Sequence, residues 1–126
     1  MRVTARVLAE QVAVVAIIVL CCWGLLLLFQ PVRVTGSSMN PALFVGDLVF
    51  VDRDGEVRPG DIALYRTQGH GPVLHRVLRV GRQGSVRTKG DANPVPDRDP
   101  VPAAAIVGPV RAVLPVGKAV AWWRGR

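Results

Sequence analysis

The chain has 126 residues, half of them hydrophobic, and a net charge of +7. This length leaves room for one compact domain at most. The arginines are scattered singly, with no long basic run and little aromatic interleaving, so we expect no nucleic-acid partner. A positive surplus of this kind also suits a domain that is tethered at an anionic membrane surface.

Residues 12–29 form an apolar run without any charged side chain. At about 1.5 Å per residue, a helix of this length spans roughly 27 Å, close to the hydrocarbon thickness of a bilayer. The alternative is a cleaved secretory signal, but its apolar core is usually about 7–15 residues long. The following Gln30-Pro31-Val32-Arg33 also offers no small-residue cleavage pattern. We therefore predict a retained transmembrane helix over 12–29, ended by Pro31.

Charges on the two sides of this span predict its orientation. Arg2 and Arg6 precede it, whereas Arg33 alone follows it closely, which slightly favours an amino terminus in the cytoplasm. Residues 1–11 are then a short cytoplasmic leader, and residues 30–115 form a domain on the extracytoplasmic side of the cell membrane. The two cysteines are adjacent within the span and cannot bridge each other, so the sequence predicts neither a disulfide nor a zinc site.

The segment after the span consists of short apolar or alternating runs separated by glycine, proline and aspartate turns. Thr67 to Pro72 is predicted as a glycine-rich loop, and Asp91 to Pro102, with four prolines, as an irregular one. Short strand-like runs separated by such turns are typical of a mainly β, antiparallel barrel or sandwich. Strands are predicted over residues 48–51, 62–65, 73–80, 86–89 and 106–114.

The tail over 116–126 predicts a short amphipathic helix that carries Trp122 and Trp123. Paired tryptophans beside arginine are typical of a membrane interface, and the tail is assigned to that role. The alternative is that the two rings cap the domain core.

A nucleophilic serine is one chemical possibility, because Ser37 and Ser38 stand in a stretch of small residues. Such a serine needs a neighbouring base. His75 alternates with apolar residues in a predicted strand, where a lone histidine is also compatible with a core position. His70 lies between two glycines in a loop, and Lys89 is an alternative base if it is neutral. Lys118, near the tail tryptophans, is a poorer candidate.

An acidic partner for an imidazole would have to come from the proline-rich loop. Asp91, Asp97 and Asp99 cluster there, although aspartates beside proline and glycine often only cap turns. The residue types alone are therefore compatible with a Ser–His–Asp arrangement and do not choose among the three carboxylates.

Several segments together resemble the membrane-bound type I signal peptidases, in which the serine before methionine is catalytic. The common bacterial form of that family uses a lysine base. His75 makes this chain similar to the histidine class of endoplasmic-reticulum, archaeal and sporulating-bacterium enzymes. The matching segments are, in order, Gly36-Ser37-Ser38-Met39-Asn40-Pro41-Ala42-Leu43, Gly46-Asp47-Leu48-Val49, Gly60-Asp61-Ile62, His75-Arg76-Val77 and Thr88-Lys89-Gly90-Asp91-Ala92-Asn93 with Asp97-Arg98.

The resemblance implies a serine endopeptidase that removes signal peptides from exported preproteins through an acyl-enzyme. It assigns Ser38 as nucleophile, His75 as general base, Asp97 as the orienting acid and Asp91 as a supporting acid. It implies no metal and no cofactor. The partners are the lipid bilayer and preprotein signal peptides that carry small residues at the first and third positions before the cut.

The chain departs from the family pattern beside the nucleophile. Gly36 stands where many members have a serine that helps to hold the oxyanion, and Ser37 stands next to Ser38. The oxyanion is then expected to rest mainly on the backbone N–H of Ser38. The alternatives are a related Ser–Lys protease that uses Lys89, and a membrane-tethered β module that binds a partner and cuts nothing.

Overall fold

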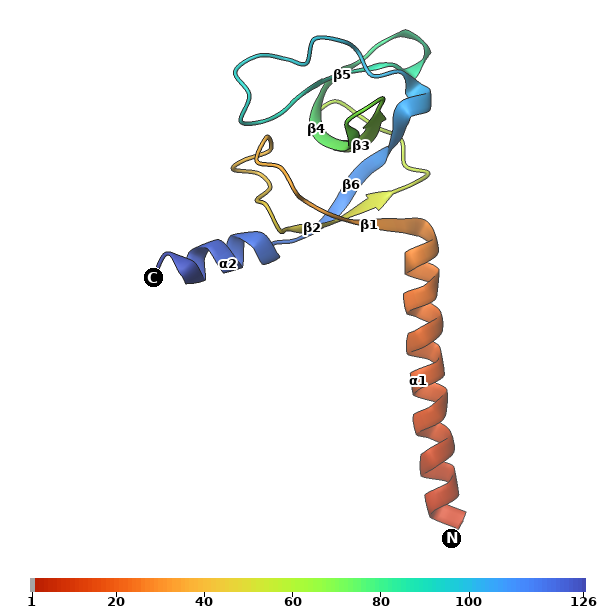
Figure 1. Cartoon of the computed structure of the whole chain (residues 1–126). Coiled ribbons are helices and arrows are strands. Elements are labelled where there is room, and N and C mark those ends of the chain that lie inside the picture. Colours follow the sequence, from red (N-terminus) through yellow and green to blue (C-terminus); the bar gives the residue numbers. More distant parts are fainter. Residues whose placement is uncertain (1) are drawn as a thin grey trace.

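The computed structural model describes residues 2–126, in which one long helix leads directly into a small β domain (Figure 1). Helix α1 (Arg2–Leu28) begins well before the predicted span and ends just short of its predicted last residue. Phe29 is instead the first residue of strand β1 (Phe29–Arg33). The helix stops early because Pro31 has no amide hydrogen and disfavours a helical backbone at the residue before it.

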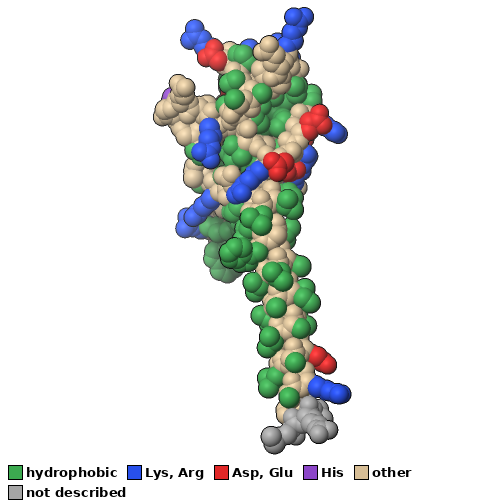
Figure 2. Space-filling model, turned by 90° about the vertical axis from the view of Figure 1, so that its right-hand side faces the viewer, with side chains coloured by type: hydrophobic (Ala, Val, Ile, Leu, Met, Phe, Trp, Pro, Cys, Tyr) green, Lys and Arg blue, Asp and Glu red, His purple; other side chains and the backbone are tan. Residues whose placement is uncertain are grey.

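Helix α1 exposes apolar side chains rather than packing them against the domain. Its Thr4–Leu28 part is long and apolar enough to cross a membrane, by length and composition, and its most apolar window is not buried at all. Figure 2 shows green side chains along the shaft of the helix, with charged ones at its start and over the β domain.

The β domain is one antiparallel sheet, which confirms the predicted mainly β class. The strand order is β1-β2-β6-β3-β4-β5. Within residues 2–126, the edge strands β1 and β5 do not pair with each other, so the sheet stays open rather than closing into a barrel. The remaining strands are β2 (Leu48–Asp52), β3 (Ile62–Thr67), β4 (Gly71–Val80), β5 (Val86–Lys89) and β6 (Ile106–Leu114).

The strands found in the structure include all five that were predicted, extended by a residue or two at several ends. Strands β3 and β4 pair as far as Thr67 and Gly71, so the predicted glycine-rich loop is a tight hairpin. Strand β1 was not predicted. It lies at the sheet edge, where a proline without an amide hydrogen is tolerated.

The hydrophobic core is divided into two clusters on opposite faces of β3. Leu64 packs in the first cluster, while its neighbours Ala63 and Tyr65 pack in the second. Side chains alternate between faces along a strand, so this one strand separates the two clusters. The first cluster also contains Val34, Met39, Leu43, Val49 and Val51, and the second Val77, Val86 and Val101.

The connections include two short 3-10 helices, η1 (Arg82–Gly84) and η2 (Ala103–Ala105), and the chain ends in helix α2 (Val116–Arg124). The helix predicted for the tail is therefore present. Trp122 and Trp123 are 59% and 75% exposed, so they do not cap the core.

Candidate active site

Ser38 is presented by a tightly turned segment between β1 and β2. The amide of Asn40 donates to Ser37 O at 3.1 Å, and that of Leu43 donates to Met39 O at 3.0 Å. Met39 and Leu43 are each 1% exposed and belong to the first core cluster. Because these two side chains anchor the turn, Ser38 is held half-buried at the surface with its hydroxyl available.

His75 lies in the middle of β4, paired with Ala63 of β3, and is 9% exposed. Its Nε2 is 3.2 Å from Ser38 Oγ, and its Nδ1 is 2.6 Å from Asp97 Oδ2. A carboxylate only accepts hydrogen bonds, so Nδ1 carries the proton and Nε2 is left to accept from the serine hydroxyl. The three side chains therefore form a continuous chain of hydrogen-bonding groups, and Ser38, His75 and Asp97 are brought together.

Asp97 receives two further hydrogen bonds that hold it in place. Thr88 Oγ1 and the Tyr65 hydroxyl donate to the same oxygen, Oδ2, at 2.6 and 3.1 Å. The backbone is also fixed, because the amide of Asp97 donates to Thr88 O at 2.9 Å. Partial burial works to raise the pKa of Asp97, but the hydrogen bonds from Thr88, His75 and Tyr65 together outweigh it and lower that pKa.

Tyr65 stays neutral in this setting. Burial, together with the nearby Asp97 carboxylate, raises the pKa of Tyr65 to about 12, despite the opposing hydrogen bond from Thr88. Its oxygen also lies 3.2 Å from His75 Nδ1. With a single proton to give, the hydroxyl donates to the carboxylate and acts as a fixed support beneath the His75–Asp97 pair.

Asp91 forms an ion pair with Arg76 and does not bond to His75. Arg76 donates to it through Nε at 2.8 Å and Nη2 at 2.7 Å, and also through Nη1 to Gly60 O at 2.8 Å. The hydrogen bond from Arg76 lowers the pKa of Asp91, so this carboxylate stays ionised. Lys89, in register with Arg76 on β5, contributes charge near Asp91 and makes no hydrogen bond to Ser38 among the described residues.

The loop that carries Asp91 and Asp97 also contacts the segment around Ser38. The amide of Ala92 donates to Ser38 O at 2.8 Å. Gly90 is buried beside the same oxygen, and a Cβ built on it would come within 2.8 Å of Ser38 O and 2.7 Å of Asn93 Nδ2. A glycine is therefore needed there for the close approach, which fixes the backbone of Ser38 against this loop.

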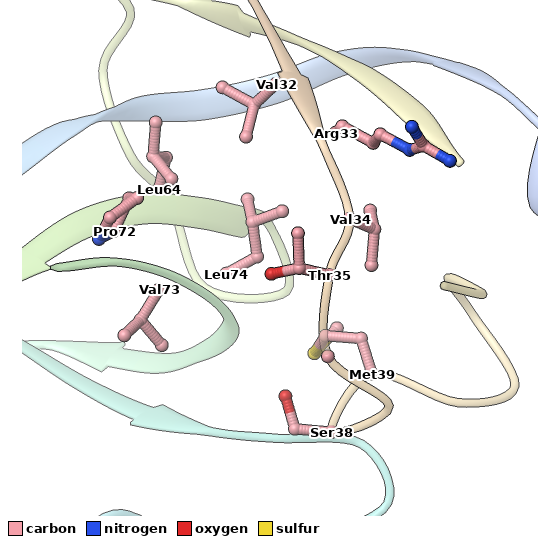
Figure 3. A pocket seen from close by; sticks show the side chains of 11 residues that line it. Val32, Arg33, Val34, Thr35, Ser38, Met39, Leu64, Pro72, Val73 and Leu74 are labelled. Atoms are coloured by element: carbon pink, nitrogen blue, oxygen red, sulfur yellow. The ribbon is translucent and has the colours of Figure 1, made fainter. Parts of the chain in front are cut away.

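A cleft of about 270 Å³ opens beside Ser38 (Figure 3). The hydroxyl groups of Thr35 and Ser38 face across it toward the β4 residues Val73 and Leu74, whereas the Arg33 side chain points away. Its walls are mostly apolar, and they come from the segment before the nucleophile and from β3 and β4: Val32, Val34, Gly36, Met39, Leu64 and Pro72.

The other predicted residues lie around this site without bonding to it. Ser37 is exposed, and a Cβ at Gly36 would meet no atom within 4 Å, so the missing serine there is not excluded by crowding. Asp99 and His70 are exposed and line a second cavity, whose walls also include His75 and Asp97. Of the three candidate aspartates, only Asp97 reaches the histidine.

Three residues of the site were not predicted: Tyr65, Thr88 and Arg76. A signal was present for Tyr65 alone, because its hydroxyl ends the apolar run 62–64, whereas Thr88 lies between two basic residues. Tyr65 and Thr88 both reach Asp97 because β3, β4 and β5 pair in one particular register. No single segment of the sequence predicts that register.

Comparisons with known proteins find several relatives of this chain. The signal peptidase complex catalytic subunit sec11 of Dictyostelium discoideum is 35% identical over 104 residues, covering 71% of this chain and 58% of that protein. The corresponding subunit SEC11 of Scheffersomyces stipitis is 44% identical over 71 residues, covering 52% of this chain and 43% of that protein. The subunit SEC11 of Schizophyllum commune is 32% identical over 113 residues, covering 67% of this chain and 58% of that protein.

The chain thus spans about half the length of the curated relatives it matches. These relatives confirm the resemblance to signal peptidases that the sequence indicated. A family model described as Peptidase S24-like matches residues 31–111, from β1 into β6, and includes every residue of the Ser38 site. The chain therefore belongs to the peptidase S24-like family.

Proposed function

We propose that this chain is a membrane-anchored signal peptidase that uses Ser38 as nucleophile, His75 as general base and Asp97 as orienting acid. The observation that carries the proposal is the unbroken series of contacts from Ser38 Oγ through both ring nitrogens of His75 to Asp97 Oδ2, beside an open cleft. Membership of a peptidase family and the names of the relatives support the same reading.

The mechanism follows from the protonation states of the three groups. His75 Nε2 takes the hydroxyl proton as Ser38 Oγ attacks the scissile carbonyl, and the ionised Asp97 stabilises the imidazolium that forms. The same proton then passes to the leaving amine, which frees the mature chain and leaves an acyl-enzyme. A water molecule, deprotonated by His75, releases the signal peptide.

The negative oxygen of the tetrahedral intermediate needs a donor close to Ser38. The backbone N–H of Ser38 has no hydrogen-bond partner elsewhere in residues 2–126, so it is free to serve. With Gly36 in place of a serine, the second donor would have to come from another group, such as the Thr35 hydroxyl that faces the cleft.

The cleft suits substrates with small residues before the cut. Its volume of about 270 Å³ and its valine and leucine walls leave little space for long or charged side chains. Rejection of larger residues would then result from steric exclusion, and the apolar lining would favour alanine-like side chains.

Helix α1 would act as the membrane anchor, with residues 1–11 in the cytoplasm and the β domain on the extracytoplasmic side of the cell membrane. Only a short segment joins the end of α1 to Ser38, and at about 3.3 Å per residue it reaches roughly 30 Å at most. The nucleophile would stay near the surface where an exported chain emerges. Accessory subunits, as the names of the relatives imply for those proteins, are part of this proposal.

Cleavage of a preprotein by the full-length chain in detergent or lipid discs tests the proposed roles. We expect Ser38→Ala and His75→Ala to reduce cleavage to the background rate, and Lys89→Ala to retain most of it. His70→Ala is the matched control, because it removes the other histidine, which is exposed and makes no bond to the site.

The rival functions give different results in the same assay. Cleavage that survives His75→Ala but is lost in Lys89→Ala would establish a Ser–Lys protease. Background cleavage by both wild type and Ser38→Ala would favour the membrane-tethered binding module, and full cleavage by Ser38→Ala would overturn both protease assignments.

A further inference from the structure

Helix α2 exposes an apolar surface that nothing in residues 2–126 covers. Trp122 and Trp123 are 59% and 75% exposed, and Val116 and Val120 are 46% and 43% exposed. Val116, Val120 and Trp123 follow one another at helical spacing, so they share one side of the helix. A short helix with this much exposed apolar surface is expected to have a partner.

The start of helix α2 is hydrogen-bonded to the β domain. The amide of Lys118 donates to Asp47 Oδ1 at 3.1 Å, and Asp47 itself is only 2% exposed. Gly117 is buried against the same segment, where a Cβ would come within 2.1 Å of Val45 O. The first turn of α2 is therefore fixed to the segment that follows the nucleophile turn, and the tryptophans are held out from the domain.

The charged side chains that α2 and the residues after it carry are all positive. No acidic residue follows Asp99 in the chain, whereas α2 and the two residues after it contain Lys118, Arg124 and Arg126. The guanidinium of Arg126 lies 3.9 Å from the centre of the Trp122 ring. Tryptophan next to arginine is typical of the headgroup layer of a membrane, where the ring is buried and the cation meets phosphate.

A groove of about 360 Å³ lies between α2 and the two ends of the segment that carries Ser38, at Arg33 and at Val45. Its floor is apolar, with Val45, Val116 and Val120, and two arginines, Arg33 and Arg124, line it. The combination of an apolar floor with two guanidinium groups suits a phospholipid, whose acyl chains are apolar and whose phosphate is anionic.

The two helices leave the same side of the domain in different directions. In Figure 1, α1 runs down the view while α2 runs across it, both from the side where β1 and β2 lie. A helix that crosses a bilayer and one that lies on its surface have this mutual arrangement. We propose that α2 lies in the headgroup layer of the membrane that α1 crosses, and that the Arg33–Arg124 groove binds an anionic phospholipid headgroup.

This inference rests on the membrane anchoring of α1 in the proposed function, and it is tested without any measurement of cleavage. The chain has three tryptophans, so Trp23→Phe leaves the α2 pair as the only source of tryptophan fluorescence. The full chain is placed, one copy per disc, in lipid discs that contain phospholipids brominated near the headgroup or near the chain end. One copy per disc excludes a second chain as the partner.

We expect the α2 tryptophans to be quenched strongly by the shallow bromines and weakly by the deep ones. The matched chain, with Trp122→Phe and Trp123→Phe, retains Trp23 and reports on α1 alone. Quenching of Trp23 without quenching of the α2 pair overturns the inference and leaves the anchor intact. Absence of quenching in both chains overturns both.

The lipid charge is tested by comparing anionic with purely zwitterionic discs. Each cation near an anionic surface contributes roughly a fivefold change in binding, so Arg33→Gln with Arg124→Gln should weaken the docking of α2 by about 25-fold. Arg87→Gln is the control, because it removes a positive charge on β5 at the opposite edge of the sheet. Equal quenching in the two kinds of disc, with or without the arginines, overturns the anionic headgroup site.

Discussion

Replacing Tyr65 by phenylalanine removes one oxygen from a buried side chain and leaves its ring in place. The lost hydroxyl donates to Asp97 Oδ2 at 3.1 Å, whereas Thr88 Oγ1 and His75 Nδ1 approach the same oxygen at 2.6 Å. A hydrogen bond to a charged acceptor contributes about 1.5–3 kcal/mol, and the longest of three belongs at the lower end. We expect the free energy of unfolding to fall by about 1.5 kcal/mol at pH 7, and kcat/KM to fall roughly tenfold.

The loss of stability should depend on pH because it acts through a carboxylate. The pKa of folded Asp97 lies below its ordinary value of 3.8, so its ionised form stabilises the fold above pH 3.8, and this contribution is lost as the pH falls through the folded pKa. Removing the tyrosine hydroxyl raises that pKa toward the ordinary value. The stability difference between wild type and Tyr65→Phe should therefore be fully present at pH 7 and shrink below about pH 4.

The difference should also shrink in alkali. Burial raises the pKa of Tyr65 from 10.0 to about 12, so neutral Tyr65 stabilises the fold below pH 10, and this contribution is lost as the pH rises through 12. Phenylalanine has no proton to lose, and its fold is not weakened in this range by that route. Wild type should then approach the variant above pH 10.

Urea unfolding of the full chain in detergent micelles, followed from acid to alkaline pH, measures this profile, and preprotein cleavage at pH 7 measures kcat/KM. A stability difference that stays constant from pH 7 down through the acid titration of Asp97 would mean that the hydroxyl contributes only to packing. Cleavage by Tyr65→Phe as low as that by His75→Ala would refute the supporting role, since it would place Tyr65 in the proton transfer itself.

Three further substitutions test neighbouring contacts. Gly90→Ala places a Cβ 2.8 Å from the nucleophile's carbonyl oxygen and should lower kcat by about a hundredfold in single-turnover assays, while Gly24→Ala, with no atom within 4 Å, should leave it unchanged. Arg76→Gln breaks a two-pronged, partly buried ion pair and should cost about 1–2 kcal/mol in urea unfolding at pH 7. Arg58→Gln breaks an exposed pair and should cost about 0.5 kcal/mol or less; equal costs would contradict this reasoning. Thr88→Val removes the shorter donor to the orienting carboxylate and should reduce kcat/KM more than Tyr65→Phe does; a smaller effect would reverse the assigned order of the two donors.

The β domain was predictable because its strands carry strong local signals. Residues 86–89 and 106–114 have the predicted boundaries in the structure, since glycine or proline turns flank each of them. Strand β1 escaped prediction because Gln30-Pro31-Val32-Arg33 directly follows an apolar helix and contains a proline. Its pairing partner, β2, lies beyond the whole nucleophile segment, so the signal is not local.

The site was predictable only in part, for a related reason. Ser38 and His75 stand in recognisable contexts, a small-residue turn and an apolar strand. The choice among the three aspartates depends on the path of a proline-rich loop, which is fixed by the hydrogen bond from the Asp97 amide to Thr88 O. No periodic pattern describes such a path, so the resemblance to a family selected Asp97 where the residues alone did not.

The junction between α1 and the sheet contains no linker. Leu28 ends the helix, Phe29 begins β1, and the amide of Arg53 at the end of β2 donates to Leu28 O at 3.4 Å. The apolar run of α1 without charged side chains covers residues 12–28, and at about 1.5 Å per residue it spans roughly 26 Å, close to a hydrocarbon layer of about 30 Å, so the helix would stand nearly upright in a bilayer of that thickness and tilt in a thinner one. Because no linker separates them, the β sheet would tilt together with α1 as one rigid unit. Bilayer thickness, which differs among cell membranes, would then determine how far above the lipid the serine works and which bonds of a passing chain it reaches.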